Sequence, residues 1–376
     1  MKKNVLILSL LISHLLSGSQ QFVKTTAPCN DELLKNTAGR WIPPGERLHA
    51  KIFKQQQQEI LNRINIIHQF VYTIYPSPLG IDAVWYKATS DEEFAQQLKI
   101  DHYPDGKLRE DFVNGIPVVV YSYLAKFYKY ACGFDRHEGE IMRGYPGEGG
   151  ASFVVEANNL AGLLPRDQGA EGMEIGGRKI RMMPPVKGKW KGYTLYQRET
   201  GSGFTMVLLH REGMLPYIPV TRKQYLDLSI SWLTKFYDAW TADLVKSEKL
   251  AANVGIKPDS SAKEKIEKQK KDVLKYYRDE LAATTAAGLL DTPSVITLGM
   301  CDIDIQYPIF TSESEGGRML ATENPAYFQK DLPKYTPQLF VLLLERDGWS
   351  YTPKNEPIKL LEENFPIEKL QAMIDK

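Results

Sequence analysis

Apolar residues recur at spacings of three and four along two long segments of the chain, which predicts amphipathic helices. The first stripe ends before Pro76 and comprises Ile60, Ile64, Ile67, Val71 and Ile74. The second follows Thr221 and Gln224, which have capping-box spacing, and comprises Leu226, Ile230, Leu233, Tyr237, Trp240 and Leu244. A further helix over 262–286 completes an αα-hairpin predicted at about 222–286.

Segments rich in β-branched and aromatic residues predict strands elsewhere in the chain. The pair Gly176-Gly177 predicts a two-residue hairpin, and Glu212-Gly213 predicts a second one. A closing helix is predicted over Phe365–Ile374. Hairpins and segregated helices together indicate an α+β fold with a mostly antiparallel sheet and a long N-terminal amphipathic helix. The predicted strands are Ile81–Tyr86, Ile116–Tyr130 (whose pattern also fits a helix), Ser152–Glu156, Phe204–His210, Leu215–Val220, Cys301–Ile309 and Leu339–Leu344.

The N-terminus has the three-part pattern of a secretory signal peptide over 1–19. Two lysines precede a largely apolar run, Val5–Leu16, and the small residues Ser17 and Ser19 fit a cleavage site. The mature chain then starts near Gln20. The apolar run is shorter than the roughly 20 residues that span a bilayer, and a retained membrane anchor is the alternative.

The rest of the chain is predicted to form an extended lead-in over 20–45 and a single α+β domain over 46–376. Apolar residues make up 43% and charged residues 25% of the chain, values typical of globular proteins. The formal charge is +1, and removing 1–19 takes away two lysines and no acid, which leaves −1. We therefore expect a soluble, periplasmic or extracellular protein with no nucleic-acid partner, no cofactor and no membrane span in the mature chain.

Three cysteines, Cys29, Cys132 and Cys301, allow one disulfide in an oxidising compartment, with three possible pairings. The alternative is that all three are small buried residues. The sequence contains no Cys-x-x-Cys, no His-Glu-x-x-His and no phosphate-binding loop, and its histidines do not cluster locally. No metal site is predicted.

Four residues are candidates for catalysis. Asp302 and Asp304 lie two positions apart on a predicted strand, so their side chains point the same way at a separation of about 7 Å. Such a pair suits a cation or general acid–base chemistry, and a solvated strand face is the alternative. His210 beside Glu212 suits a tuned base, with turn surface as the alternative.

Basic and aromatic residues interleave in one segment, where Trp190 and Tyr193 alternate with Lys187, Lys189 and Lys191. This pattern suits a polyanion or a sugar, and the alternative is a loop whose tryptophan packs into the core. A second aromatic set shares one strand face and is either a stacking platform or part of a sheet core: Tyr121, Tyr123 and Phe127.

Two segments are similar to stretches of uncharacterised exported proteins of Bacteroidetes. They are Leu209–Leu226 and Asn324–Phe328, the latter continuing through Leu332-Pro333 and Pro337–Leu339. The resemblance implies export and carries no activity. We expect a binding or interaction role at the cell envelope, because a well-patterned fold lacks local catalytic motifs. The alternatives are a hydrolase whose site is assembled from distant segments and a carbohydrate-binding module.

Overall fold

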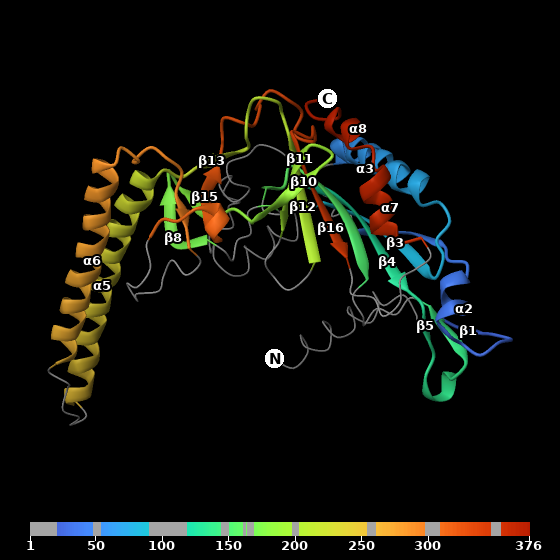
Figure 1. Cartoon of the computed structure of the whole chain (residues 1–376), viewed down its shortest axis with the longest axis horizontal. Coiled ribbons are helices and arrows are strands. Elements are labelled where there is room, and N and C mark those ends of the chain that lie inside the picture. Colours follow the sequence, from blue (N-terminus) through green and yellow to red (C-terminus); the bar gives the residue numbers. More distant parts are fainter. Residues whose placement is uncertain are drawn as a thin grey trace. The chain divides into compact units, whose positions relative to one another are not determined.

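The chain folds into two compact units, each of which is described by itself. Both contain helices and mainly antiparallel strands (Figure 1), so the predicted α+β class is confirmed. A division into compact units does not show whether each unit folds independently. The single domain predicted over 46–376 therefore stays a prediction. Unit 1 is Met1–Gly162, Val186–Met214 and Phe328–Lys376, and unit 2 is Leu163–Pro185 and Leu215–Tyr327. The computed structural model describes residues 21–47, 54–89, 119–143, 150–160, 163, 169–197, 203–253, 261–297, 309–346 and 355–376.

Unit 1 is built around an eight-stranded sheet. All neighbouring pairs are antiparallel except β2 and β3, which run parallel. Strand β16 lies between β12 and β7 and is buried over Leu339–Leu344, which confirms the predicted central strand. In spatial order the strands are β10 (Val186–Trp190), β11 (Tyr193–Gln197), β12 (Gly203–His210), β16 (Leu339–Arg346), β7 (Ala151–Ala157), β4 (Tyr121–Lys129), β3 (Ile81–Thr89) and β2 (Trp41–Arg47).

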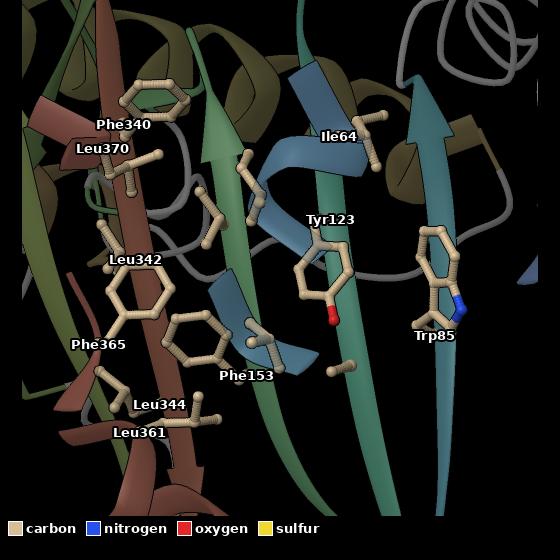
Figure 2. Packing of buried hydrophobic residues seen from close by; sticks show 14 of the residues in the cluster. Ile64, Trp85, Tyr123, Phe153, Phe340, Leu342, Leu344, Leu361, Phe365 and Leu370 are labelled. Carbon is tan, nitrogen blue, oxygen red and sulfur yellow. The ribbon is translucent and has the colours of Figure 1, made fainter. Parts of the chain in front are cut away.

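The core of unit 1 lies where α3 (Lys54–Ile74), α7 (Pro357–Asn364) and α8 (Ile367–Gln371) pack on this sheet. Figure 2 shows Tyr123, Phe153 and Leu342 projecting from their strands into this core. Each such side chain contributes about 1.5–3 kcal/mol when it leaves water, so burial accounts for most of the attraction between helices and sheet. The helix stripe is at most 1% exposed at Ile60, Ile64, Ile67 and Val71.

The aromatic set on β4 is core. Tyr121, Tyr123 and Phe127 are at most 1% exposed, and they alternate with half-buried residues along the strand. This alternation is the period of a strand that has one face against helices. The platform interpretation is therefore wrong for these side chains, because a stacking platform must be reachable by its ligand.

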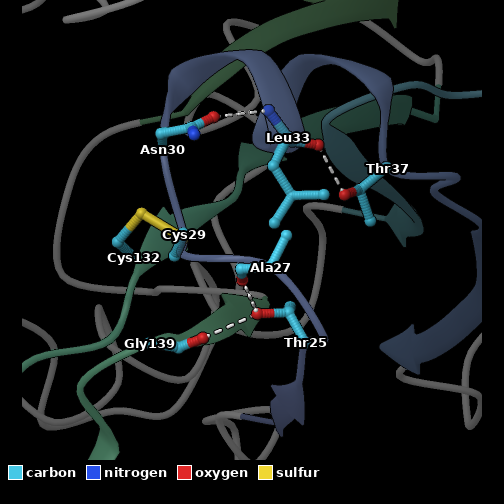
Figure 3. The surroundings of a disulfide bond; sticks show 8 residues. All are labelled: Thr25, Ala27, Cys29, Asn30, Leu33, Thr37, Cys132 and Gly139. Atoms are coloured by element: carbon cyan, nitrogen blue, oxygen red, sulfur yellow. Dashed lines mark hydrogen bonds between the residues drawn. A yellow bond between two sulfur atoms is a disulfide. The ribbon is translucent and has the colours of Figure 1, made fainter.

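A disulfide joins Cys29 to Cys132, with 5.6 Å between their Cα atoms (Figure 3). Beside it, the Asn30 side chain accepts a hydrogen bond from the Leu33 N–H at 2.9 Å and caps a short helix. Of the three pairings left open by the sequence this one forms, and Cys301 lies outside the described residues. The surrounding elements are α2 (Asp31–Asn36), a 3₁₀ turn, η2 (Asp135–His137), and a sheet of β1 (Gln21–Lys24), β6 (Glu140–Arg143) and β5 (Ala131–Cys132).

Unit 2 contains a five-stranded sheet and the helices α5 (Arg222–Asn253) and α6 (Ala262–Ala286), which pack side by side (Figure 1). The predicted capping box is present, because the Gln224 side chain accepts from the Thr221 N–H at 2.9 Å while Thr221 Oγ1 accepts from the Gln224 N–H at 3.2 Å. The remaining elements are β8 (Gly169–Ile175), β9 (Arg178–Met182), β13 (Tyr217–Pro219), β14 (Val295–Ile296), β15 (Arg318–Glu323) and the 3₁₀ turn η4 (Glu313–Glu315).

Two details of these elements bear on the sequence predictions. Strands β8 and β9 form the predicted hairpin, and Gly176 and Gly177 both have positive φ, as its turn requires. Trp240, expected in the buried helix seam, is 41% exposed. A strict seven-residue repeat drifts by about 20° per heptad on a straight helix, which carries Trp240 to the edge of the contact.

Three other predictions are corrected. Strands β12 and β13 do not form a hairpin at Glu212-Gly213, because β11 and β16 occupy both edges of β12 and β13 pairs with β15. The closing helix predicted over Phe365–Ile374 is present but shorter, because α8 covers Ile367–Gln371. Pro366 lacks the N–H that continues a helix and separates α8 from the preceding helix α7. The lead-in predicted to be extended over 20–45 contains a helix, because β1, α2 and part of β2 lie within it.

Among the described residues, no helix combines the length and apolarity that crossing a bilayer requires.

Candidate functional site

Five ring-bearing residues from one helix and three neighbouring strands of unit 1 pack together. Their exposure is graded, from Tyr123 at 0% and Trp85 at 8% to Tyr72 at 40%, with the other two half-buried. Many small-molecule sites have this composition, with mostly apolar side chains, a few polar groups and one side open to the surface. We call this set the aromatic cluster: Trp41, His68, Tyr72, Trp85 and Tyr123.

Strand parity and pairing bring these residues together. Trp85 and Lys87 lie two positions apart on β3, which places both on the face that packs against α3. Lys87 pairs across the ladder with Tyr123 of β4. On the other side of β3, Trp41 of β2 donates its indole N–H to the Tyr75 carbonyl at 2.8 Å, which fixes β2 to the end of α3.

His68 occupies the centre of the cluster. Its imidazole stacks on the Trp85 indole, with ring centroids 3.8 Å apart and an angle of 4° between the ring planes. The edge of Trp41 meets it at 5.3 Å, and Tyr72 lies one helical turn further along α3 at 5.8 Å. The Tyr123 hydroxyl is 3.3 Å from Nδ1. The other nitrogen, Nε2, has no hydrogen-bond partner among the residues that the structure describes.

The surroundings of His68 keep its imidazole neutral. Burial, together with the smaller effect of the nearby Lys87 ammonium, lowers the pKa of His68 from 6.5 to about 4. Burial also holds the pKa of Tyr123 well above 10, so its hydroxyl keeps its proton. At neutral pH the cluster therefore presents an uncharged imidazole, which can donate or accept one hydrogen bond at Nε2.

Lys87 is the charged group of this region. The residue is only 8% exposed, and its Nζ lies 5.0 Å from the centroid of the Trp85 ring. Its neighbour across the parallel ladder is Glu46 of β2, an acidic residue.

Two of the catalytic candidates of the sequence analysis, His210 and Glu212, lie in the described part of the chain and do not contact each other. His210 holds the turn after β12, with Nδ1 at 2.8 Å from the Arg211 carbonyl and 3.1 Å from the Met214 carbonyl. Its own carbonyl accepts a hydrogen bond from Gln371 at 2.7 Å. Glu212 is exposed in this turn and no contact with His210 is seen.

The ligand-binding candidates Trp190 and Tyr193 flank a two-residue hairpin turn between β10 and β11. The Trp190 indole N–H donates to the Glu362 carbonyl at 2.8 Å, and Lys191 Nζ donates to the Phe365 carbonyl at 2.8 Å. Both contacts satisfy carbonyls at the end of α7, where a helix leaves its last carbonyls without partners. Tyr193 is partly buried against the main core.

The candidate pair Asp302 and Asp304 lies outside the described residues. Within 21–47, 54–89 and the other described ranges, no group of three His, Cys, Asp or Glu side chains is arranged to hold a metal ion. Comparisons of the chain with family models, with curated proteins and with solved structures found no match. Function is therefore inferred from the geometry of the site.

Sequence reasoning did not single out His68 or Lys87, although both carry a signal. His68 follows Ile64 by four positions and precedes Tyr72 by four, so a polar ring borders the apolar stripe of α3. In the strand Ile81–Thr89, Lys87 shares a face with the alternate apolar positions Ile81, Ala83 and Trp85, where a charge is unexpected. Each signal is weak because a long side chain at an element's end often reaches water.

Proposed function

We propose that this chain is an exported protein of the cell envelope with a binding role, and that the aromatic cluster is its ligand site. The observation that carries the proposal is His68, a neutral imidazole that lies among four aromatic rings and keeps Nε2 available on a partly exposed surface. Flat apolar surface with one directional hydrogen-bonding group suits a small molecule that contains a ring.

Two features support export. The first nineteen residues have the composition of a signal peptide, and a disulfide joins Cys29 to Cys132. Disulfides persist in oxidising compartments and are rare in the cytosol. N-terminal sequencing of the protein from its natural host should find Gln20 or a neighbour as the first residue. Recovery of Met1, or of both cysteines as free thiols in the cytosolic fraction, would contradict export.

Binding at the cluster is tested by NMR on the full mature chain with a library of aromatic acids, amino acids, nucleosides and sugars. A ligand should shift the indole N–H signals of Trp41 and Trp85, assigned with tryptophan-to-phenylalanine variants. His68→Ala should weaken binding about tenfold or more, because it removes both a stacking partner and Nε2. His137→Ala, which removes a histidine outside the cluster, is the matched control and should bind normally.

The same experiment separates binding from the rival readings. Recovery of the bound compound unchanged supports a binding protein, and its steady conversion supports a hydrolase. Binding of a sugar that is lost in Trp190→Ala, and kept in His68→Ala, favours a carbohydrate-binding module at β10 instead. If no compound moves the two indole signals, or His68→Ala binds as tightly as the wild type, the cluster is a packing feature of α3.

A further inference from the structure

The second half of α5 exposes large apolar side chains to solvent. None of the residues 238–253 is fully buried. Figure 1 shows α5 and α6 extending side by side beyond the strands of unit 2. Phe236 is 37% exposed, Trp240 is 41% exposed and Leu250 is 64% exposed, and we call these three residues the exposed line of α5.

The exposed line occupies one face of the helix. At about 100° per residue its members fall within an arc of about 80°, and they extend over about 21 Å of helix axis. The Phe236 ring stands between Trp232 and Trp240, with ring centroids 5.3 and 5.9 Å away. The seam against α6 is a different face, which contains Leu233 and Tyr237. Helix α5 therefore has a second apolar face, and that face is open to solvent.

Lysines border the exposed line. Lys235, Lys246 and Lys249 are exposed, and they fall within about 60° of one another on the side of α5 away from its buried seam. The whole helical hairpin is basic: the segment 222–286 contains 13 Lys and Arg against 10 Asp and Glu, a formal charge of +3, whereas the complete chain carries +1. Positive charge is therefore concentrated on the hairpin that carries the apolar line.

Aromatic and aliphatic side chains beside lysines are the composition of helices that lie in the headgroup layer of a bilayer. We propose that α5 docks on an anionic phospholipid surface, with the exposed line among the headgroups and the three lysines at their phosphates. This docking is peripheral, because the helix lies on the membrane and does not cross it. The inference goes beyond the proposed function and does not depend on the aromatic cluster, which belongs to unit 1.

The chemistry of this face favours lipid over a protein partner. Lysine is depleted from the centres of protein–protein interfaces, whereas three lysines border the exposed line. Tryptophan favours the boundary between headgroups and acyl chains, where its ring leaves water and its N–H stays hydrated. A protein partner anchors its side chains in pockets, and a line along one convex helix does not form a pocket.

Acidic residues on this half of α5 determine how strongly the face is attracted to anionic lipid. Asp238 is paired with Lys270 of α6 at 2.5 Å. Asp243 is exposed between Trp240 and Leu250 and opposes the attraction. The three lysines outnumber it, so binding should depend on anionic lipid and weaken with salt.

The plainer account is that these are ordinary exposed apolar residues, which are common singly on protein surfaces. Under that account, replacing the exposed line changes vesicle binding no more than replacing other exposed apolar residues does. Under the docking account, the exposed line and the lysines beside it carry the binding.

The test measures by cosedimentation how the full mature chain partitions onto phosphatidylcholine vesicles, with and without phosphatidylglycerol. The serine variant of the exposed line combines Phe236→Ser, Trp240→Ser and Leu250→Ser. The glutamine variant combines Lys235→Gln, Lys246→Gln and Lys249→Gln. The matched control combines Phe134→Ser, Val186→Ser and Leu289→Ser, because these large apolar residues are also exposed and lie outside α5.

The wild type and the matched control should bind the anionic vesicles, and the serine variant of the exposed line should bind them about tenfold or more weakly. The glutamine variant should lose a similar factor on anionic vesicles and nothing on neutral ones, and added salt should weaken the wild type in the same way. A wild type that does not bind the anionic vesicles, or a serine variant that binds them like the control, overturns the proposal.

Sedimentation velocity tests whether a second copy of the chain covers this face instead. If the wild type self-associates, the serine variant does not, and neither binds vesicles, the face is an interface between copies and the lipid assignment is overturned. If the serine variant does not fold, Leu250→Ser alone decides, because this side chain is mostly exposed. It should weaken vesicle binding about threefold or more, and unchanged binding overturns the proposal. Ligand binding at the aromatic cluster is measured separately by NMR, so the two proposals fail independently.

Discussion

The low pKa of His68 makes a quantitative prediction about stability against pH. A base whose pKa is lower in the folded protein than in the unfolded chain binds fewer protons when folded. The stability that His68 contributes is therefore fully present above pH 6.5 and is lost as the pH falls from 6.5 to about 4. Below that range both states bind the proton, and the dependence from this residue ends.

The magnitude follows from the size of the pKa change. The fall from 6.5 to about 4 corresponds to roughly 3.4 kcal/mol at about 1.36 kcal/mol per pKa unit. His68 is only half-buried, so water screens part of this effect, and about half of it is expected. Between pH 7 and pH 4.5 the residue should account for roughly 1–1.5 kcal/mol of lost unfolding free energy.

The assay is urea unfolding of the wild type, His68→Phe and His137→Gln at a series of pH values from 4.5 to 7.5. Phenylalanine keeps a ring on Trp85 and cannot titrate, so His68→Phe should show a shallower fall in unfolding free energy over this range. The control His137→Gln should follow the wild type. An identical pH dependence in His68→Phe and wild type, or an NMR titration that finds His68 near 6.5, would refute the reasoning.

Two further predictions concern the region around the disulfide. Replacing Cys29 and Cys132 by serine should lower the unfolding free energy by about 2–5 kcal/mol, because the disulfide closes a loop across 103 positions. A decrease below about 1 kcal/mol, measured by urea unfolding, would mean that this loop closure does not restrain the unfolded chain. Tyr130→Phe should cost about 1–3 kcal/mol, because the Tyr130 hydroxyl donates to the buried Asp82 carboxylate at 2.6 Å. An unchanged urea midpoint would show that Arg40, whose Nε lies 3.5 Å from the Asp82 carboxylate, stabilises the Asp82 charge without the Tyr130 hydroxyl.

Local patterns predicted those features whose cause is local. The capping box of Thr221 and Gln224 and the Gly176-Gly177 turn involve residues within a few positions of one another, and both are present. The apolar run of β16 identified a strand buried on both faces. Periodicity also identified α5 and α6, since the repeat of an amphipathic helix is written into a continuous segment.

Tertiary structure alone decided which elements meet. The turn signal at Glu212-Gly213 was real, but both edges of β12 were already occupied. His68 and Tyr123 are 55 positions apart, and only the packing of α3 on the sheet that contains β4 brings their polar atoms together. A one-dimensional pattern records which face of an element is apolar, and it does not record the partner of that face. The aromatic cluster depends on that partner, which is why the sequence placed Tyr123 on an aromatic strand face and did not bring it together with His68 and Trp85.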